Sequence, residues 1–365
     1  MINILQYIPS FQVGGIESFL LALDSNKDDE FKFIYLVENP IPKEYEKQIK
    51  KNGSKIIYLP YPGYKSPRKI YHYLKELKRI IMDNNINVLH SHIWSSRPYI
   101  IPIALLTNVK VRIAHSHSKD LNSKNKFFLQ KFLLKIGVLF SNVYIGCSED
   151  ACKFAFKNRK YTVLYNGISF DKYKYDKKVR MEIRKNLNIG SETVFINVGR
   201  FCELKNQMFL VDVFNELHKE YKNSKLLLIG QGPDVQYIRK KIQTYDLSKY
   251  IMILENINNP VKFLNAADCF VFPSISEGLG ISYLEAQATG IKCVISTGVP
   301  DIGTFTKNIL KLDLKEGSNE WSKQIITFLN EKNVRKSEYC EKFDVKITAK
   351  IYQEIIRKEM KKHER

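Results

Sequence analysis

Short β-branched runs alternate with longer amphipathic segments along the whole chain, and this alternation constrains the fold more than any other feature. Apolar residues at every third or fourth position predict helices, and their regular alternation with short apolar runs is typical of βαβ units. The strands predicted in this way are 2–7, 31–37, 55–59, 88–91, 111–115, 142–147, 162–165, 194–199, 225–230, 251–254, 269–273 and 292–296. We therefore predict an α/β protein with two doubly wound parallel sheets.

A polar stretch without apolar periodicity, residues 170–178, interrupts this alternation and predicts a boundary between domains. A chain of 365 residues is long enough for two domains of ordinary size. We predict a first domain over 1–170, a linker over 171–190 and a second domain over 191–345. The basic amphipathic segment 346–365 is predicted to be a helix that packs back on the first domain.

The composition limits the function mainly through charge. Lys and Arg number 58 against 38 Asp and Glu, and the net charge of +20 implies an anionic partner, whether nucleic acid, a lipid surface or a phosphorylated substrate. The six cysteines lack Cys-x-x-Cys spacing, which predicts reduced thiols rather than disulfides or a zinc framework. No secretory signal and no apolar run of about 18 residues is recognisable, so we expect a cytoplasmic protein without a membrane span.

In doubly wound sheets ligands bind beyond the carboxyl ends of strands, so the residues that follow each predicted strand are the candidates for binding a ligand. Gly14-Gly15 precedes the first helical run, where backbone N–H groups could approach an anion or simply form a tight turn. His90-Ser91-His92 and His115-Ser116-His117 each direct two imidazoles to one face. These pairs are compatible with a metal site, with hydrogen bonds to a sugar hydroxyl or diphosphate, or with ordinary loop histidines. We predict no metal, because no nearby carboxylate or cysteine completes a usual ligand set.

Two cations follow the first strand of the second half, Arg200 directly after Gly199 and Lys205 five residues later. A planar guanidinium and a compact ammonium together suit a diphosphate, although a solvated surface pair is the alternative. Gly230-Gln231-Gly232-Pro233 follows the next strand and resembles the start of a dinucleotide fingerprint, but Val235 stands where glycine is required. We therefore predict a glycine turn beside a nucleotide pocket rather than an NAD site.

The segment from Ser276 to Ala286 carries the strongest pattern and follows the strand 269–273. Glu277 opens a glycine-rich loop, and Glu285 lies on the helix behind it. Exposed amides in such a loop bind an anion, while two separated carboxylates accept hydrogen bonds from hydroxyls. Together they indicate a nucleotide sugar. The alternative is that Glu277 caps the helix and Glu285 is a surface charge.

These motifs, in this order, resemble the retaining glycosyltransferases of family 4, which have the GT-B architecture of two Rossmann-like domains facing a central cleft. The resemblance is carried by Gly14-Gly15-Ile16-Glu17, 112–117, Tyr165-Asn166-Gly167-Ile168, Gly199-Arg200, Lys205-Asn206, 230–233, Ala267-Asp268 and 276–286. Similar proteins build bacterial capsule, exopolysaccharide or lipopolysaccharide chains. The resemblance implies transfer of a hexosyl or N-acetylhexosaminyl group from a nucleotide sugar, with UDP preferred, to a glycan or polyprenyl-diphosphate-linked acceptor, without a metal or other cofactor.

The resemblance also implies roles for single residues. Arg200 and Lys205 would bind the donor diphosphate and stabilise the charge of the leaving nucleotide. Glu277 would contact the donor sugar, and His115 or His117 the sugar or the acceptor. Further donor contacts would come from Gly14, Gly15, Gly230, Gly278, Leu279, Gly280 and, at the ribose, Glu285.

Retention implies a front-face reaction in which positioning and charge stabilisation replace a protein nucleophile. One position departs from the family pattern, because Asp301 stands where glutamate is frequent, and it is left out of the predicted site.

A basic apolar segment, 124–135, lies in the predicted acceptor-side domain. It is compatible with a helix lying on anionic lipid, and equally with an ordinary helix whose apolar side enters the core. Residues 110–160 hold 11 basic and three acidic side chains, which favours an anionic membrane surface as partner. The sequence is compatible with two alternative functions. A nucleotide-sugar epimerase of the same fold would need no acceptor, and a nucleic-acid-binding protein would bind with steep salt dependence.

Overall fold

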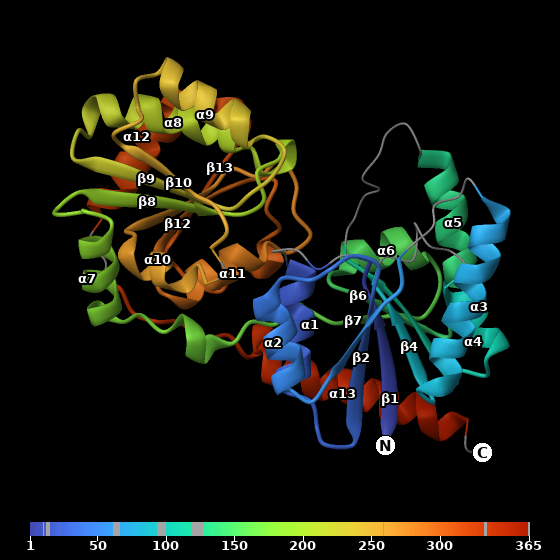
Figure 1. Cartoon of the computed structure of the whole chain (residues 1–365). Coiled ribbons are helices and arrows are strands. Elements are labelled where there is room, and N and C mark those ends of the chain that lie inside the picture. The colour runs from blue at the N-terminus through green and yellow to red at the C-terminus, as the bar shows by residue number, and fades with distance from the viewer. Residues whose placement is uncertain are drawn as a thin grey trace. The chain divides into compact units, whose positions relative to one another are not determined.

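The computed structural model of the chain describes residues 1–9, 11, 15–60, 66–92, 100–117, 127–257, 259–331 and 334–363, the side chains of 127–131 and 133 excepted. These residues form two compact units (Figure 1). The first comprises Met1–Gly167 together with Lys342–Arg365, and the second comprises Ile168–Glu341. None of the described helices is long and apolar enough to cross a membrane.

The first unit is a doubly wound parallel sheet of seven described strands. Apolar side chains alternate between its two faces, so that helices cover both. The strands pair in the order β3 (Lys55–Tyr58), β2 (Phe31–Val37), β1 (Ile2–Tyr7), β4 (Val88–Ser91), β5 (Val111–Ser116), β6 (Val143–Gly146) and β7 (Thr162–Val163). One face is covered by α1 (Gly15–Ser25), α2 (Lys43–Lys51) and α13 (Val345–Lys362). The other is covered by α3 (Pro67–Asp83), α4 (Ile100–Leu106), α5 (Phe127–Phe140) and α6 (Glu149–Phe156).

The second unit repeats this plan with six described strands, again all parallel. The strands pair in the order β10 (Ile251–Leu254), β9 (Ser224–Ile229), β8 (Thr193–Val198), β11 (Cys269–Phe272), β12 (Lys292–Ser296) and β13 (Ile309–Leu312). Its helices are α7 (Lys177–Asn186), α8 (Gln207–Glu220), α9 (Val235–Thr244), α10 (Val261–Ala266), α11 (Ile281–Ala288) and α12 (Gly317–Asn330). The predicted fold class of two doubly wound parallel sheets is therefore confirmed.

One strand escapes the sequence pattern, the edge strand β13. Its four residues include Lys311 and no β-branched residue except Ile309, and three of the four are only partly buried. A short edge strand with a lysine carries too little apolar signal to be distinguished from a loop. The structure adds it beside β12.

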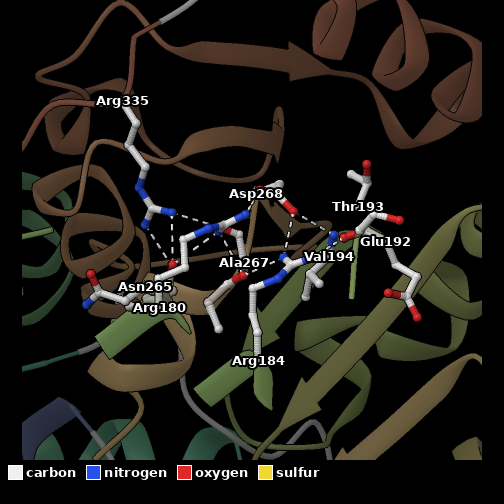
Figure 2. A network of polar contacts seen from close by, with 12 residues as sticks. Arg180, Arg184, Glu192, Thr193, Val194, Asn265, Ala267, Asp268 and Arg335 are labelled. Atoms are coloured by element: carbon white, nitrogen blue, oxygen red, sulfur yellow. Dashed lines mark hydrogen bonds and ion pairs between the residues drawn. The ribbon is translucent and has the colours of Figure 1, made fainter. Parts of the chain in front are cut away.

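Residues 171–190, predicted to be a linker, lie within the second unit. They contain the short 3-10 helix η2 (Phe170–Tyr173) and α7, which packs on α10. Figure 2 shows how α7 is held, with Arg180 donating to the carbonyl oxygens of Ala266 and Ala267 at 2.9 and 3.0 Å. Guanidinium groups therefore hold α7 in the second unit together with its buried Ile183.

The same network explains the Ala267-Asp268 motif. Arg184 donates to the Ala266 carbonyl oxygen as well, and Arg335 donates to those of residues 264, 265 and 267, so three arginines share the acceptors that the end of α10 leaves free (Figure 2). Asp268 receives Arg180 at 2.6 Å and accepts a hydrogen bond from the Val194 amide at the start of β8 at 2.8 Å. The motif therefore connects α7 to the central strands through hydrogen bonds.

The C-terminal segment forms α13 and packs on α1 and β5 in the first unit, where Figure 1 draws it in red. Gly167 explains how closely it approaches, because a Cβ at that position would lie 2.7 Å from the Val345 backbone. Thr348 also donates to the Tyr165 carbonyl at 3.3 Å. The first turn of α13 thus packs directly on the Tyr165-Asn166-Gly167 motif.

Candidate active site

The structure brings Lys205 and Glu277 together at the carboxyl ends of β8 and β11. Lys205 closes the 3-10 helix η3 (Glu203–Lys205), and its Nζ lies 2.6 Å from Oε1 of Glu277. The same Nζ lies 5.0 Å from the ring centroid of Phe272, the last residue of β11. The side chains are 24% and 8% exposed, so the cation is held by a carboxylate and an aromatic face yet keeps a surface open to a ligand.

Arg200, the second predicted cation, is exposed. Its carbonyl accepts a hydrogen bond from Gln207 Nε2 at 3.1 Å, which secures the backbone at this position. Within the described part of the chain, its guanidinium makes no hydrogen bond or ion pair. An anchored backbone with an uncommitted guanidinium suits recruitment of an anionic group, and its predicted diphosphate contact stays a prediction.

The glycine turn 230–233 packs directly against the loop that carries Arg200. Gly230 has a φ of +152°, and a Cβ there would lie 1.9 Å from the Gly199 carbonyl oxygen. A Cβ on Gly232 would lie 2.1 Å from the carbonyl oxygen of Phe201. Close backbone approach between the two loops therefore explains both glycines, and donor binding by Gly230 stays a prediction.

The loop after β11 presents backbone amides rather than side chains. Leu279 is buried, and Gly280 has a φ of +78° at the start of α11, a conformation that favours glycine. Among the described residues, the amides of Gly278, Leu279 and Gly280 have no hydrogen-bond acceptor. Glu277 does not cap α11, which excludes the structural alternative for that residue. The loop can therefore offer N–H groups to an anion beside the Lys205 ammonium.

Glu285 lies on α11 and is buried, so it is not a surface charge. Its Oε1 accepts a hydrogen bond from the Tyr173 hydroxyl at 2.5 Å, and burial raises the pKa of Glu285 to about 7. Sequence reasoning missed Tyr173, because this residue of η2 was assigned to the linker. A carboxylate already bound on one oxygen offers its other oxygen to the hydroxyls of a ligand.

The first unit gathers its four strand-end histidines into one cluster, in which His90, His92 and His115 are buried and His117 is partly buried. His90 Nε2 lies 3.1 Å from His115 Nδ1, and His92 Nδ1 lies 2.9 Å from His117 Nε2. Burial lowers the pKa of His90, His92 and His115 well below the ordinary value and that of His117 to about 3. His90, His92 and His115 present nitrogens within 4.8 Å of one another, close enough to ligate a metal, and the four rings also hydrogen-bond in two pairs; the absence of a metal stays a prediction.

Two glycines of the predicted donor site lie at the amino end of the chain. Gly15 is the first residue of α1, the helix that covers the histidine cluster through Phe19. Gly14 lies outside the described residues. A glycine at a helix start is compatible with anion binding, which stays a prediction here.

Two family models match this chain, one in each half. The family model described as Glycosyltransferase Family 4 matches residues 13–172, and the one described as Glycosyl transferases group 1 matches residues 179–344. The putative glycosyltransferase EpsF of Bacillus subtilis is 25% identical over 336 residues, 88% of this chain and 86% of EpsF. The capsular polysaccharide biosynthesis glycosyltransferase CapH of Staphylococcus aureus is 27% identical over 372 aligned positions, 97% of this chain and 98% of CapH.

A solved structure supports the fold independently. HepE of Anabaena, crystallised in complex with UDP and glucose, matches with a TM-score of 0.81 and 15% identity, over 98% of this chain and 100% of HepE. The two family models follow the order of the two sheet units and together span most of the chain. The chain therefore belongs to the glycosyltransferases of family 4, with the GT-B fold.

Proposed function

We propose that the protein is a retaining glycosyltransferase that transfers a hexosyl or N-acetylhexosaminyl group from a UDP-sugar to a growing, lipid-linked bacterial surface glycan. The observation that carries the proposal is the Lys205 ammonium, held 2.6 Å from Glu277 beside the amides of the loop 278–280. The name of CapH supports a role in polysaccharide biosynthesis, and the UDP and glucose in the HepE crystal support a nucleotide-sugar donor.

The chemistry follows from where the charges stand. When the bond between the sugar and the diphosphate breaks, negative charge develops on the departing phosphate oxygen, and Lys205 with Arg200 neutralises it. Glu277 accepts hydrogen bonds from sugar hydroxyls while it holds Lys205 in place. Glu285 accepts hydrogen bonds from the ribose through the oxygen that Tyr173 leaves available. Two protein cations supply the positive charge that a metal would otherwise provide, so we propose that no metal is needed.

Retention of configuration requires the acceptor hydroxyl to attack from the side of the leaving group. A new bond forms between the acceptor oxygen and the anomeric carbon as the bond to the phosphate oxygen breaks, and that oxygen takes the acceptor proton. Glu277 is ion-paired with Lys205, which suits a positioning role better than that of a nucleophile. The anomeric configuration of the product, determined by NMR, tests this step, because inversion contradicts it.

An exposed apolar face on α5 supports contact with a membrane. Phe132 and Leu139 are 60% and 64% exposed and lie seven residues apart, hence on one face, with exposed Lys135 between them. Val138 is buried, so the helix has both a core side and an outer apolar side. We propose that this outer side lies on anionic lipid. Lys124, Lys126 and the Lys131 side chain lie outside the described residues.

Membrane binding is tested by co-sedimentation with vesicles that contain anionic lipid. Lys135→Glu is expected to reduce binding, and Phe132→Ser to reduce it further, since an apolar anchor is lost. Lys47→Glu, at an exposed position of α2, is the matched control for the change in charge. Equal sedimentation of all variants contradicts the proposal.

The donor is tested by thermal shift with UDP, GDP and their sugars. A ligand at 100 times its dissociation constant adds about 2.7 kcal/mol of stability. Transfer is then measured with and without a lipid-linked acceptor. Product that forms only with acceptor supports a transferase, whereas isomerised or free sugar formed from the donor alone supports the epimerase alternative.

A further inference from the structure

The polar residues at the carboxyl ends of β1, β4 and β5 form a single hydrogen-bonded cluster. Gln6 of β1 is in register with His90 of β4, which is in turn in register with Ile113 of β5. The side chains of His90 and His92 face the same side of the sheet as those of His115 and His117, two and four residues beyond Ile113. This is the face that α1 and α13 cover. Strand alternation therefore replaces apolar side chains by one amide and four imidazoles only toward the carboxyl ends of the strands.

One branch of the cluster runs through Tyr352 of α13. Gln6 Nε2 donates to the Tyr352 hydroxyl oxygen at 3.2 Å, and that hydroxyl lies 2.8 Å from His90 Nδ1. An amide NH₂ can only donate, so the Tyr352 hydroxyl oxygen accepts a hydrogen bond from Gln6. The same hydroxyl then donates its O–H to His90 Nδ1. His90 then carries its hydrogen on Nε2 and donates to His115 Nδ1 at 3.1 Å. His115 is left with its hydrogen on Nε2.

The second branch starts at the other end of the same amide. His92 Nε2 lies 3.0 Å from Gln6 Oε1, which can only accept, so His92 carries its hydrogen there. Its Nδ1 accepts from His117 Nε2 at 2.9 Å. His117 is neutral and has given its only N–H to His92, so its Nδ1 is an unprotonated acceptor. That atom is buried and has no partner among the described residues.

We propose that Gln6 and Tyr352 are positioning residues that place the hydrogens of all four histidines on Nε2, so that His117 presents an unprotonated Nδ1 to a hydroxyl of the glycosyl donor or acceptor. The ligand assignment rests on the proposed function, whereas the tautomer assignment rests on the geometry alone. A buried acceptor without a donor is destabilising, and a ligand hydroxyl is the group that satisfies it.

The arrangement is all-or-none, because each hydrogen bond dictates the next. Rotation of the Gln6 amide by half a turn would exchange donor and acceptor and would move the hydrogens of all four histidines to Nδ1. Such coupling rigidifies a buried network and makes its polarity depend on a few anchors. Tyr352, which is 346 positions from Gln6 in sequence, anchors only the branch through His90.

The test is nitrogen-15 NMR of the full chain labelled on histidine, which separates protonated from unprotonated ring nitrogens. The expected spectrum assigns the Nε2–H tautomer to His90, His92, His115 and His117. Tyr352→Phe is expected to release the tautomers of His90 and His115 and to leave His117 unchanged. Gln6→Met, which removes the acceptor of His92, is expected to release His117 as well.

Tyr35→Phe is the matched control, since Tyr35 is buried on the same face and donates to the Leu20 carbonyl instead. It is expected to leave all four tautomers unchanged. A hydrogen on Nδ1 of His117 in the unsubstituted protein, or a His117 tautomer that is insensitive to Gln6→Met, overturns the proposal.

Kinetics provides the second readout. Gln6→Met is expected to raise the KM of one substrate about tenfold while the KM of the other substrate stays within twofold. A loss spread equally over both substrates contradicts a contact with one hydroxyl. If the four histidines have the expected tautomers but the protein shows no transferase activity, the assignment of the hydrogen-bond network stands and only the proposed function is overturned.

Discussion

The two units share one scaffold but place opposite kinds of polar groups at the carboxyl ends of their central strands. The first unit gathers neutral groups, four imidazoles with an amide and a phenol, and burial keeps the imidazoles uncharged. The second unit gathers charges, with Lys205 paired to Glu277 and Glu285 behind them. The doubly wound sheet therefore supplies position only, whereas the side chains at the strand ends decide which ligand groups each unit can bind.

The difference extends to pH dependence, with opposite signs. The four clustered histidines of the first unit, His90, His92, His115 and His117, have folded-state pKa values below the ordinary 6.5, so the unfolded chain binds more protons and stability falls as the pH falls below 6.5. Glu285 has a folded-state pKa of about 7, above the ordinary 4.5, so its contribution to stability falls as the pH rises between these values.

The largest expected effect is acid destabilisation of the first unit. Between pH 6.5 and 5.5 each buried histidine is expected to cost about 1 kcal/mol of unfolding free energy, or roughly 4 kcal/mol for the cluster. Hydrogen exchange, corrected for intrinsic rates and resolved by peptide, measures both units in one sample. The second unit, in which His218 is the one described histidine with a lowered pKa, is expected to lose far less. Equal losses in the two units contradict the comparison.

The next effect concerns the charged site of the second unit. Lys205→Met is expected to reduce turnover roughly 100- to 1,000-fold, since it removes the cation that meets the developing phosphate charge. Lys241→Met is the matched control, because Lys241 also pairs with a carboxylate, Asp212, and lies over a tyrosine ring, but on α9 away from the site. Comparable losses in both variants would show that Lys205 acts through stability rather than catalysis.

Glu285→Gln is expected to separate stability from binding. The substitution removes a carboxylate that burial penalises and keeps a hydrogen-bond acceptor for Tyr173, so the second unit gains on the order of 3 kcal/mol at pH 8. Affinity for UDP falls, because a neutral amide accepts hydroxyl groups less strongly than a carboxylate does. Denaturant unfolding and calorimetry measure the two quantities. The exposed Glu182→Gln is the control and is expected to change neither.

The smallest expected effect tests the loops that support the charges. Gly230→Ala is expected to destabilise the second unit by roughly 1–3 kcal/mol more than Gly317→Ala, since a Cβ at 230 meets the Gly199 carbonyl and one at 317 meets open space. Gly317 has a φ of +81°, so the control includes the cost of a strained backbone. Urea unfolding of the two variants measures the difference, and equal midpoints contradict close packing of the two loops.

Much of the fold could be predicted because the strands are buried apolar runs whose pattern is local. The strand predicted at 269–273 is β11 at Cys269–Phe272, and that at 31–37 is β2 without change. Prediction failed where stability comes from polar contacts. The predicted linker contains Arg180 and Arg184, whose guanidinium groups donate to carbonyl oxygens distant in sequence, and such contacts leave no local apolar pattern.

Local sequence patterns specify which chemical groups follow each strand, because strand ends and glycine turns are encoded by neighbouring residues. Lys205, Glu277, Glu285 and the two histidine pairs were identified in this way. Which of these groups come into contact, and in which protonation state, depends on the folded chain. It pairs Lys205 with Glu277, gives Glu285 the partner Tyr173, and joins the histidines through Gln6 and Tyr352. Burial and hydrogen-bond polarity depend on neighbours brought together by folding, and no local pattern encodes them.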